Sequence, residues 1–117
     1  LDHQAVDVVI IDPMYNGILE SLRMAALCDA FEINVASHNY CGPVGTLITA
    51  AFGAVVPNFR VMETDYVQVP WAWDLLTAKP IIQNGHIELM NGPGWGAEIN
   101  EDAVAEHPPI AAQPGPQ

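Results

Sequence analysis

Three residues of the types that carry proton-transfer chemistry occupy matching places along the chain. Asp12, His38 and Glu63 each follow a short apolar run, and the intervals between them are 26 and 25 residues. A carboxylate beside an imidazole fixes its tautomer and makes it a better base. A second carboxyl group nearby can hydrogen-bond a substrate oxygen when it is protonated. These residue types predict acid–base chemistry.

Each of the three residues also has a simpler explanation. Asp12 precedes Pro13 and is typical of a residue that begins a turn. His38 could be an ordinary loop histidine, and Glu63 an ordinary carboxylate at the end of a strand. The repetition at nearly equal spacing favours one shared site over three separate coincidences.

Two other sites are less well supported by the same stretch. A zinc site at His38 and Cys41 has only two ligands close together, and no second pair has metal spacing. A nucleophilic pair of Ser37 and His38 is disfavoured because adjacent strand residues point to opposite faces.

The segments around these residues alternate between strand and helix patterns. Runs rich in β-branched residues predict strands, and longer runs of helix formers predict helices. We expect strands at 6–11, 33–37 and 59–63 and helices at 18–31 and 44–56. The first strand should be buried on both faces, as in a parallel sheet.

Two further patterns refine this outline. Residues 12–17, "DPMYNG", combine Asp-Pro and Asn-Gly and predict a turn. In the first helix, apolar side chains recur at intervals of three and four and predict the buried face. These side chains are Ile18, Leu19, Leu22, Ala26 and Leu27.

The order β-α-β-α-β with short connections predicts an α/β fold with a parallel sheet and right-handed crossovers. The carboxyl ends of parallel strands meet at one rim, where active sites of α/β barrels lie. Asp12, His38 and Glu63 should share that rim. We expect residues 1–66 to form this unit, 67–107 to form an irregular tail with one short strand, and 108–117 to be a disordered Pro-rich end.

Composition narrows the classes of partner. The formal charge of −11 comes from 14 carboxylates against three Lys and Arg, which argues against a nucleic acid or an anionic membrane as partner. No apolar run has the roughly 20 residues of a membrane span. Cys28 and Cys41 are expected to be free thiols in a reducing compartment, and no signal peptide is visible, so we expect a cytoplasmic protein. The start of the chain, without Met and close to a strand, suggests a piece of something longer.

Three stretches carry a resemblance to a known family. They are "IIDPMYNGILESLRMAALCDAF", "INVASHNYCGPVGTLITAAFGAVVPNFRVME" and "NGHIELMNGPGWGAEINEDAV". They resemble the C-terminal part of the enolase superfamily, in the acid-sugar (galactonate-type) dehydratase branch of the mandelate racemase/muconate lactonizing family. The likeness covers residues 5–107, with one departure: Asn16-Gly17-Ile18 replaces the family's Gly-Gly pair, which puts this loop's substrate contacts in doubt.

The resemblance implies the last three strands and two helices of a modified (β/α)7β barrel, with a tail that returns to a capping domain. It implies Mg²⁺ held by acidic residues upstream of this chain, and removal of the proton α to a carboxylate. His38 would be the catalytic base or acid, Asp12 would orient it, and Glu63 would bind the substrate carboxylate or the enediolate oxygen.

The implied enzyme is a sugar-acid dehydratase, a lyase with a small carboxylate substrate. A racemase or epimerase of the same family is the second possibility, and a non-catalytic fragment that acts only in assembly is the third. Tyr40 and Trp73 are assigned to substrate binding, and Trp71 is a further candidate, although packing between barrel and tail also explains these aromatic residues. We expect a homo-oligomer, or association with the missing N-terminal part, and an isolated chain without activity.

Overall fold

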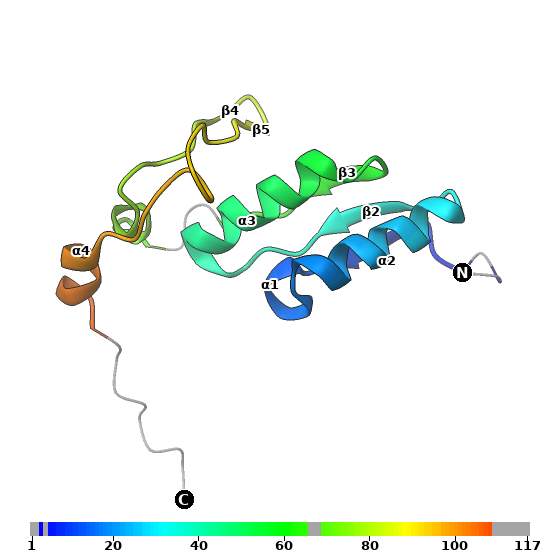
Figure 1. The fold of residues 1–117 in the computed structure, drawn as a ribbon, viewed down its shortest axis with the longest axis horizontal. Coiled ribbons are helices and arrows are strands. Elements are labelled where there is room, and N and C mark those ends of the chain that lie inside the picture. The colour runs from blue at the N-terminus through cyan, green and yellow to red at the C-terminus, as the bar shows by residue number, and fades with distance from the viewer. Residues whose placement is uncertain (1–2, 4, 66–68, 109–117) are drawn as a thin grey trace, which may run out of the picture.

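The chain folds around a three-stranded parallel sheet. The computed structural model describes residue 3 and residues 5–65 and 69–108. Strands β1 (Val8–Ile11), β2 (Asn34–Ser37) and β3 (Phe59–Met62) lie in the order β1-β2-β3, and both pairings are parallel (Figure 1). The three expected strands and their parallel arrangement are therefore confirmed. The barrel that the resemblance implies is not closed by these strands.

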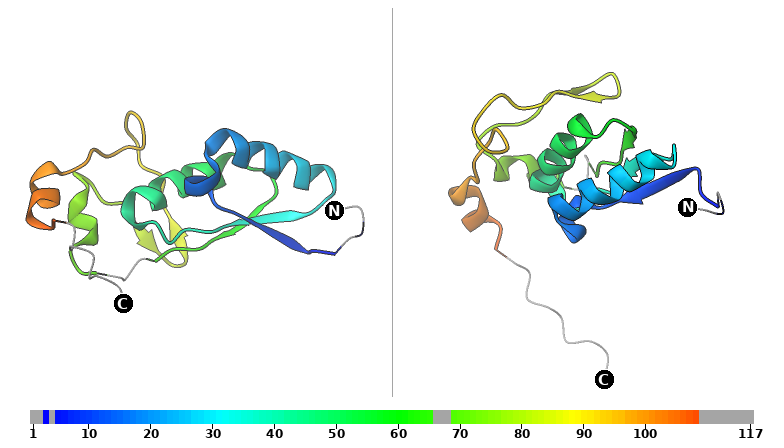
Figure 2. Two further views of the ribbon diagram at one scale, coloured as in Figure 1. Left: turned by 90° about the horizontal axis from the view of Figure 1, so that it is seen from below. Right: turned by 45° about the vertical axis from the view of Figure 1, so that its right-hand side comes forward.

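Two helices connect the strands and cover one face of the sheet. Helix α2 (Ile18–Ala30) joins β1 to β2, and α3 (Gly42–Val55) joins β2 to β3. Both lie on the same side of the sheet (Figure 2). The core between the layers is built from apolar side chains that are almost fully buried. It contains Ile11, Ala25, Cys28, Ile33, Val35, Phe52 and Val56.

The opposite face of the sheet is largely open, which corrects the expectation for the first strand. Ile11 of β1 is fully buried, whereas its neighbour Ile10 is 69% exposed. Val61 of β3 is 58% exposed. Successive side chains of a strand point to opposite faces, and α2 and α3 cover only one of them. The expected burial on both faces is therefore wrong for the described part of this chain.

The segment after β1 is helical, not a simple turn. Pro13–Asn16 form the short helix α1. Asp12 is its N-cap, because the carboxylate accepts hydrogen bonds from the backbone N–H groups of Met14 and Tyr15. Proline just inside a helix start is favourable, since its ring presets φ. The Asp-Pro pair was thus read correctly as a local chain reversal but assigned to the wrong element.

The buried face of α2 differs from the expected one. Ser21, Ala25 and Cys28 face the core, whereas Leu19 and Leu27 are exposed. Both sets recur at intervals of three and four, so periodicity alone does not choose between adjacent faces of the helix. The contact with the sheet decides, and it selects the smaller side chains. Burial raises the pKa of the Cys28 thiol, and both cysteines are free.

The tail contains more regular structure than expected. It comprises a 3-10 helix η1 (Ala72–Leu75), an antiparallel pair β4 (Ile82–Gln83) and β5 (His86–Ile87), and helix α4 (Glu101–Glu106). The expectation of one short strand is therefore wrong. Asn100 caps α4, because its side chain accepts from the backbone N–H of Ala103 and donates to the carbonyl of Asp74. The last contact joins α4 to η1.

Other expectations about the organisation remain predictions. The division between residues 66 and 67, and nearly all of the segment 108–117, lie outside the described residues. Among the helices of the described part, none is long and apolar enough to cross a membrane.

The central aromatic residue of the core supports a stability prediction. Phe52 is 2% exposed and meets Phe59 edge to face, with ring centroids 6.2 Å apart. Phe52→Ala should lower the free energy of unfolding by about 3–5 kcal/mol, because it leaves a cavity. Val55→Ala, on an exposed side chain of the same helix, should change it by less than about 0.5 kcal/mol. Urea denaturation of the native protein measures both, and equal effects would contradict this view of the core.

The open sheet predicts the behaviour of the isolated chain. Strands β1 and β3 are the two edges of the sheet, and apolar side chains such as Ile10 stand on its open face. Residues 1–117 expressed alone should therefore bind a hydrophobic dye and unfold without a cooperative transition. Circular dichroism against temperature tests this. A sharp two-state transition without dye binding would show that the chain is a stable unit.

Candidate functional site

The register of the sheet brings the three candidate residues into one row. Ile11 pairs with Ser37, and Ser37 pairs with Met62. Asp12, His38 and Glu63 are the next residue of each strand. The ladder continues there, because the backbone N–H of His38 donates to the carbonyl of Ile11 and that of Glu63 donates to the carbonyl of Ser37.

The side chains of this row belong to the open face of the sheet. Ile11 is buried against the helices, and strand side chains alternate between faces. Asp12 therefore falls on the same face as Ile10, and His38 falls on the same face as Ala36. The site thus lies at the carboxyl ends of the strands, on the face that the helices leave uncovered.

The closest contact in the site joins His38 to Asp12. Nδ1 of His38 lies 2.6 Å from Oδ2 of Asp12. An ionised carboxylate only accepts hydrogen bonds, so the proton of the neutral imidazole must reside on Nδ1. The lone pair of Nε2 is then available to take a proton. The Asp12 side chain is only 12% exposed, whereas that of His38 is 42% exposed, so the base has access to a ligand while its partner is shielded.

Each oxygen of Asp12 has a separate partner. Oδ1 accepts from the backbone N–H groups of Met14 and Tyr15, at 2.8 and 3.1 Å. Oδ2 accepts from His38. The helix cap thereby immobilises the carboxylate, and the carboxylate holds the imidazole plane. Local helix capping and orientation of the base depend on the same side chain.

Glu63 lies on the other side of the imidazole. Its Oε2 is 3.6 Å from Nε2 of His38, too long for a hydrogen bond. Oε2 also accepts from the backbone N–H of Asn39 at 3.2 Å. The Glu63 side chain is 53% exposed. A substrate atom held between Nε2 and the carboxyl group would contact both, which is the arrangement that proton transfer next to a carboxylate requires.

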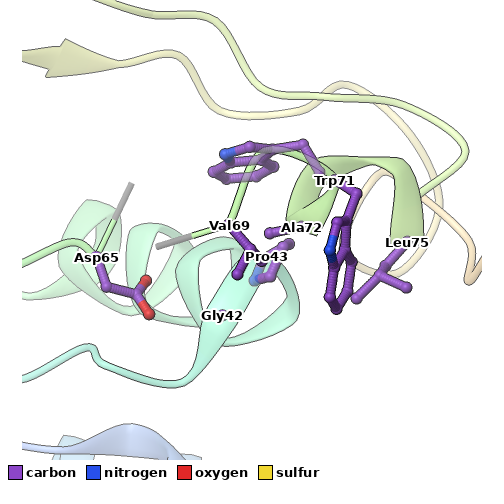
Figure 3. A pocket seen from close by; sticks show the side chains of 8 residues that line it. Gly42, Pro43, Asp65, Val69, Trp71, Ala72 and Leu75 are labelled. Atoms are coloured by element: carbon purple, nitrogen blue, oxygen red, sulfur yellow. The ribbon is translucent and has the colours of Figure 1, made fainter. Parts of the chain in front are cut away.

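The two residues assigned to substrate binding have different surroundings. Trp73 lines a cavity of about 170 Å³, and Tyr40 is 62% exposed and is not among its lining residues. The cavity lies where the start of α3 at Gly42 and Pro43 meets the η1 segment, with Asp65 at its side (Figure 3). Their role in substrate binding stays a prediction.

Packing also accounts for part of the aromatic cluster. Trp71 stacks on His107, with ring centroids 3.8 Å apart and planes 9° from parallel. This contact joins the start of η1 to the end of α4. Trp71 therefore contributes to the internal packing of the tail as well as to the lining of the cavity.

The described residues do not form a metal site of their own. No group of three or more His, Cys, Asp or Glu side chains among them could hold a metal ion. The two acidic residues of the row already contact His38 and backbone N–H groups. A magnesium site therefore does not fit this part of the chain, in agreement with the expectation that such ligands lie elsewhere.

One member of the site was not recognised from the sequence. Asn39 is fully buried, and its backbone N–H is the hydrogen-bond donor to the Glu63 carboxylate. The sequence signal was its position directly after His38, but an asparagine there is equally typical of a loop. Its burial depends on packing against α3 and cannot be read from residue type.

Comparison with known proteins agrees with the resemblance. Residues 1–103 match the family described as enolase C-terminal domain-like. A D-xylonate dehydratase of Haloferax volcanii is 39% identical over 108 residues, which are 92% of this chain and 26% of that protein. A D-gluconate dehydratase of Thermoproteus tenax is 32% identical over 104 residues, 87% of this chain and 21% of that protein. The chain thus spans about a quarter of the length of the curated relatives it matches.

A crystal structure shows the same fold. A protein from Burkholderia xenovorans strain LB400, provisionally named an L-alanine-DL-glutamate epimerase and bound to magnesium and fumarate, is 45% identical. The match has a TM-score of 0.88 and covers 94% of this chain and 27% of that one. The family match extends over most of the chain and includes all three residues of the site. The chain belongs to the enolase C-terminal domain-like family of mandelate racemase and muconate lactonizing type.

Proposed function

We propose that this chain provides the acid–base residues of a sugar-acid dehydratase. The observation that carries the proposal is the contact of 2.6 Å between His38 and Asp12, with Nε2 of the same ring facing Glu63. This arrangement offers one base with a defined tautomer beside a carboxyl group. Proton abstraction next to a carboxylate needs both components.

The relatives support the choice of substrate class. The two curated relatives are named for D-xylonate and D-gluconate, which are polyhydroxylated carboxylates. The Burkholderia protein binds fumarate, another small carboxylate. A small sugar acid is therefore the substrate class proposed here, and Tyr40 and Trp73 are proposed to contact it.

In this proposal His38 moves the proton in both halves of the reaction. Nε2 takes the proton from the carbon next to the substrate carboxylate, and the bond electrons pass into an enediolate. The C3–oxygen bond then breaks, and the departing hydroxyl takes a proton from His38 and leaves as water. The remaining enol becomes a 2-keto-3-deoxy acid. Asp12 keeps the imidazole oriented throughout.

Glu63 is proposed to bind a carboxylate oxygen of the substrate. Oε2 is already used by the N–H of Asn39, so Oε1 is the atom that can carry a proton toward the substrate. A donor placed where negative charge develops contributes about 3 kcal/mol to catalysis. The magnesium ligands are proposed to lie outside residues 1–117, and we propose that the chain assembles with that part and into a cytoplasmic homo-oligomer.

An epimerase or racemase is the second candidate, because a structure at 45% identity carries an epimerase name. Both reactions begin with removal of the α proton and differ in whether the C3 hydroxyl leaves. Incubation of the native protein with sugar acids and Mg²⁺ in heavy water separates them. A 2-keto-3-deoxy product supports the dehydratase, whereas deuterium exchange with a new epimer and no loss of water supports the epimerase. No exchange with any acid would favour a non-catalytic assembly piece.

Replacement of the base gives the first test of the mechanism. His38→Asn in the native protein should slow α-proton exchange by about 10²- to 10⁴-fold, because the proton acceptor is lost. His86→Asn is the matched control, since His86 lies exposed in β5 and contacts only the carbonyl of Asn84. Exchange is measured by NMR in heavy water. Unchanged exchange in His38→Asn would remove this residue from the mechanism.

Two substitutions of Asp12 separate its two duties. Asparagine can cap α1 with its single oxygen, but its NH₂ group then faces Nδ1 of His38 and forces the ring proton onto Nε2. Asp12→Asn should therefore keep stability and lower turnover by about 10²-fold. Asp12→Ala should lose both, with a stability cost of about 1 kcal/mol.

Turnover and urea denaturation of the two Asp12 variants are compared in the same native protein. Full activity of Asp12→Asn would contradict the role of Oδ2 in orienting His38. Equal stability of both variants would contradict the capping role of Oδ1.

A further inference from the structure

The loop between β2 and α3 contains a buried polar chain that none of the proposed catalytic roles uses. Asn39 is fully buried and Thr46 is 1% exposed. The side-chain Nδ2 of Asn39 donates to Oγ1 of Thr46 at 2.9 Å, and the hydroxyl of Thr46 donates to the carbonyl of Gly42 at 3.1 Å. Thr46 thereby ties the residue after His38 to the first turn of α3.

The direction of these hydrogen bonds is internally consistent. The single hydrogen of the Thr46 hydroxyl is used on the Gly42 carbonyl, so Oγ1 can only accept from its other neighbour. The Asn39 amide must therefore present its NH₂ group to Thr46. A buried donor that lost this acceptor would remain unsatisfied, which is costly in a protein interior.

The same residue connects this chain of bonds to the site. The backbone N–H of Asn39 donates to Oε2 of Glu63, and Asn39 directly follows His38. Among the described residues, this N–H is the only hydrogen-bond donor to the Glu63 carboxylate. The Glu63 side chain is otherwise half exposed, so its position near Nε2 of His38 depends on where Asn39 is held.

Glycine residues allow the close approach of loop and helix. Gly42 has a φ of +71°, a conformation that other residues rarely adopt. A Cβ on Gly45 would stand 2.7 Å from Cβ of Cys41 and 3.0 Å from Oδ1 of Asn39. The packing that buries Asn39 against α3 therefore has no room for a side chain at position 45.

We infer that Asn39 and Thr46 are positioning residues, which hold the Glu63 carboxylate and the His38 loop in the geometry for proton transfer. Neither side chain touches the substrate in this scheme, and both act through the backbone N–H of Asn39. The inference rests on the proposed function for its effect on turnover. It makes a separate statement about the order of the loop, which can be measured without any substrate.

The chain contains a matched control for this test. Thr49 lies one turn further along α3, is fully buried, and has a hydroxyl without a hydrogen-bond partner among the described residues. Thr→Val removes one hydroxyl and keeps nearly the same volume at either position. Only at Thr46 does it remove the acceptor of Asn39.

The experiment compares Thr46→Val, Thr49→Val and Thr46→Ser in the native protein. Thr46→Val should lower kcat by about 10-fold or more while KM changes by less than about twofold, because the reacting groups are displaced. Amide hydrogen exchange in the peptide that contains residues 38–41 should become faster in the same variant. Thr46→Ser, which keeps the hydroxyl, should restore both properties, and Thr49→Val should resemble the unsubstituted protein.

Each outcome decides the inference. Equal behaviour of Thr46→Val and Thr49→Val in kcat and in amide exchange would overturn it, as would a loss confined to KM. If the unsubstituted protein turns over no sugar acid, the proposed function fails, and faster amide exchange in Thr46→Val still supports the positioning role. If Thr46→Val does not fold, Thr46→Cys replaces it, since a thiol is only a weak hydrogen-bonding group of similar size.

Discussion

Backbone hydrogen bonds extend the parallel ladder one residue beyond each of the three strands. His38 donates to the carbonyl of Ile11, and Glu63 donates to the carbonyl of Ser37. A parallel ladder repeats its spacing regularly, so residues about 25 positions apart in the chain become lateral neighbours. The site exists because this register places Asp12 in the same row. A shift of one residue in any strand would turn its site residue to the opposite face.

Short-range contacts then convert the row into a site with a defined geometry. Asp12 uses one oxygen to cap a helix and the other to hold the imidazole of His38. Glu63 is held by the N–H of Asn39, whose side chain is bound to α3 through Thr46. Each functional group is therefore fixed by the element that follows or flanks its strand. Helix packing on one face of the sheet supports a site that opens on the other face.

The strands and the two long helices were predictable from local patterns. β-Branched runs and helix formers separated by Gly and Pro mark these elements, and alternation of strand and helix implies parallel pairing. Patterns failed where a choice depended on contacts. The face of α2 that carries Ser21 has the same periodicity as the one that carries Leu19, and the sheet selects the first. Asp12 and Pro13 begin a short helix as readily as a turn, and the short elements of the tail lack strong periodicity.

The sequence by itself determined which residue types stand at the carboxyl ends of the strands, because strand patterns end where Asp12, His38 and Glu63 begin. It also carried the family resemblance. Only the tertiary structure decided which atoms meet: Oδ2 of Asp12 with Nδ1 of His38, and the buried Asn39 with Glu63. The reason is physical. Strand propensity is local, whereas a contact between residues 26 positions apart depends on sheet register and on the packing of helices that lie between them in the chain.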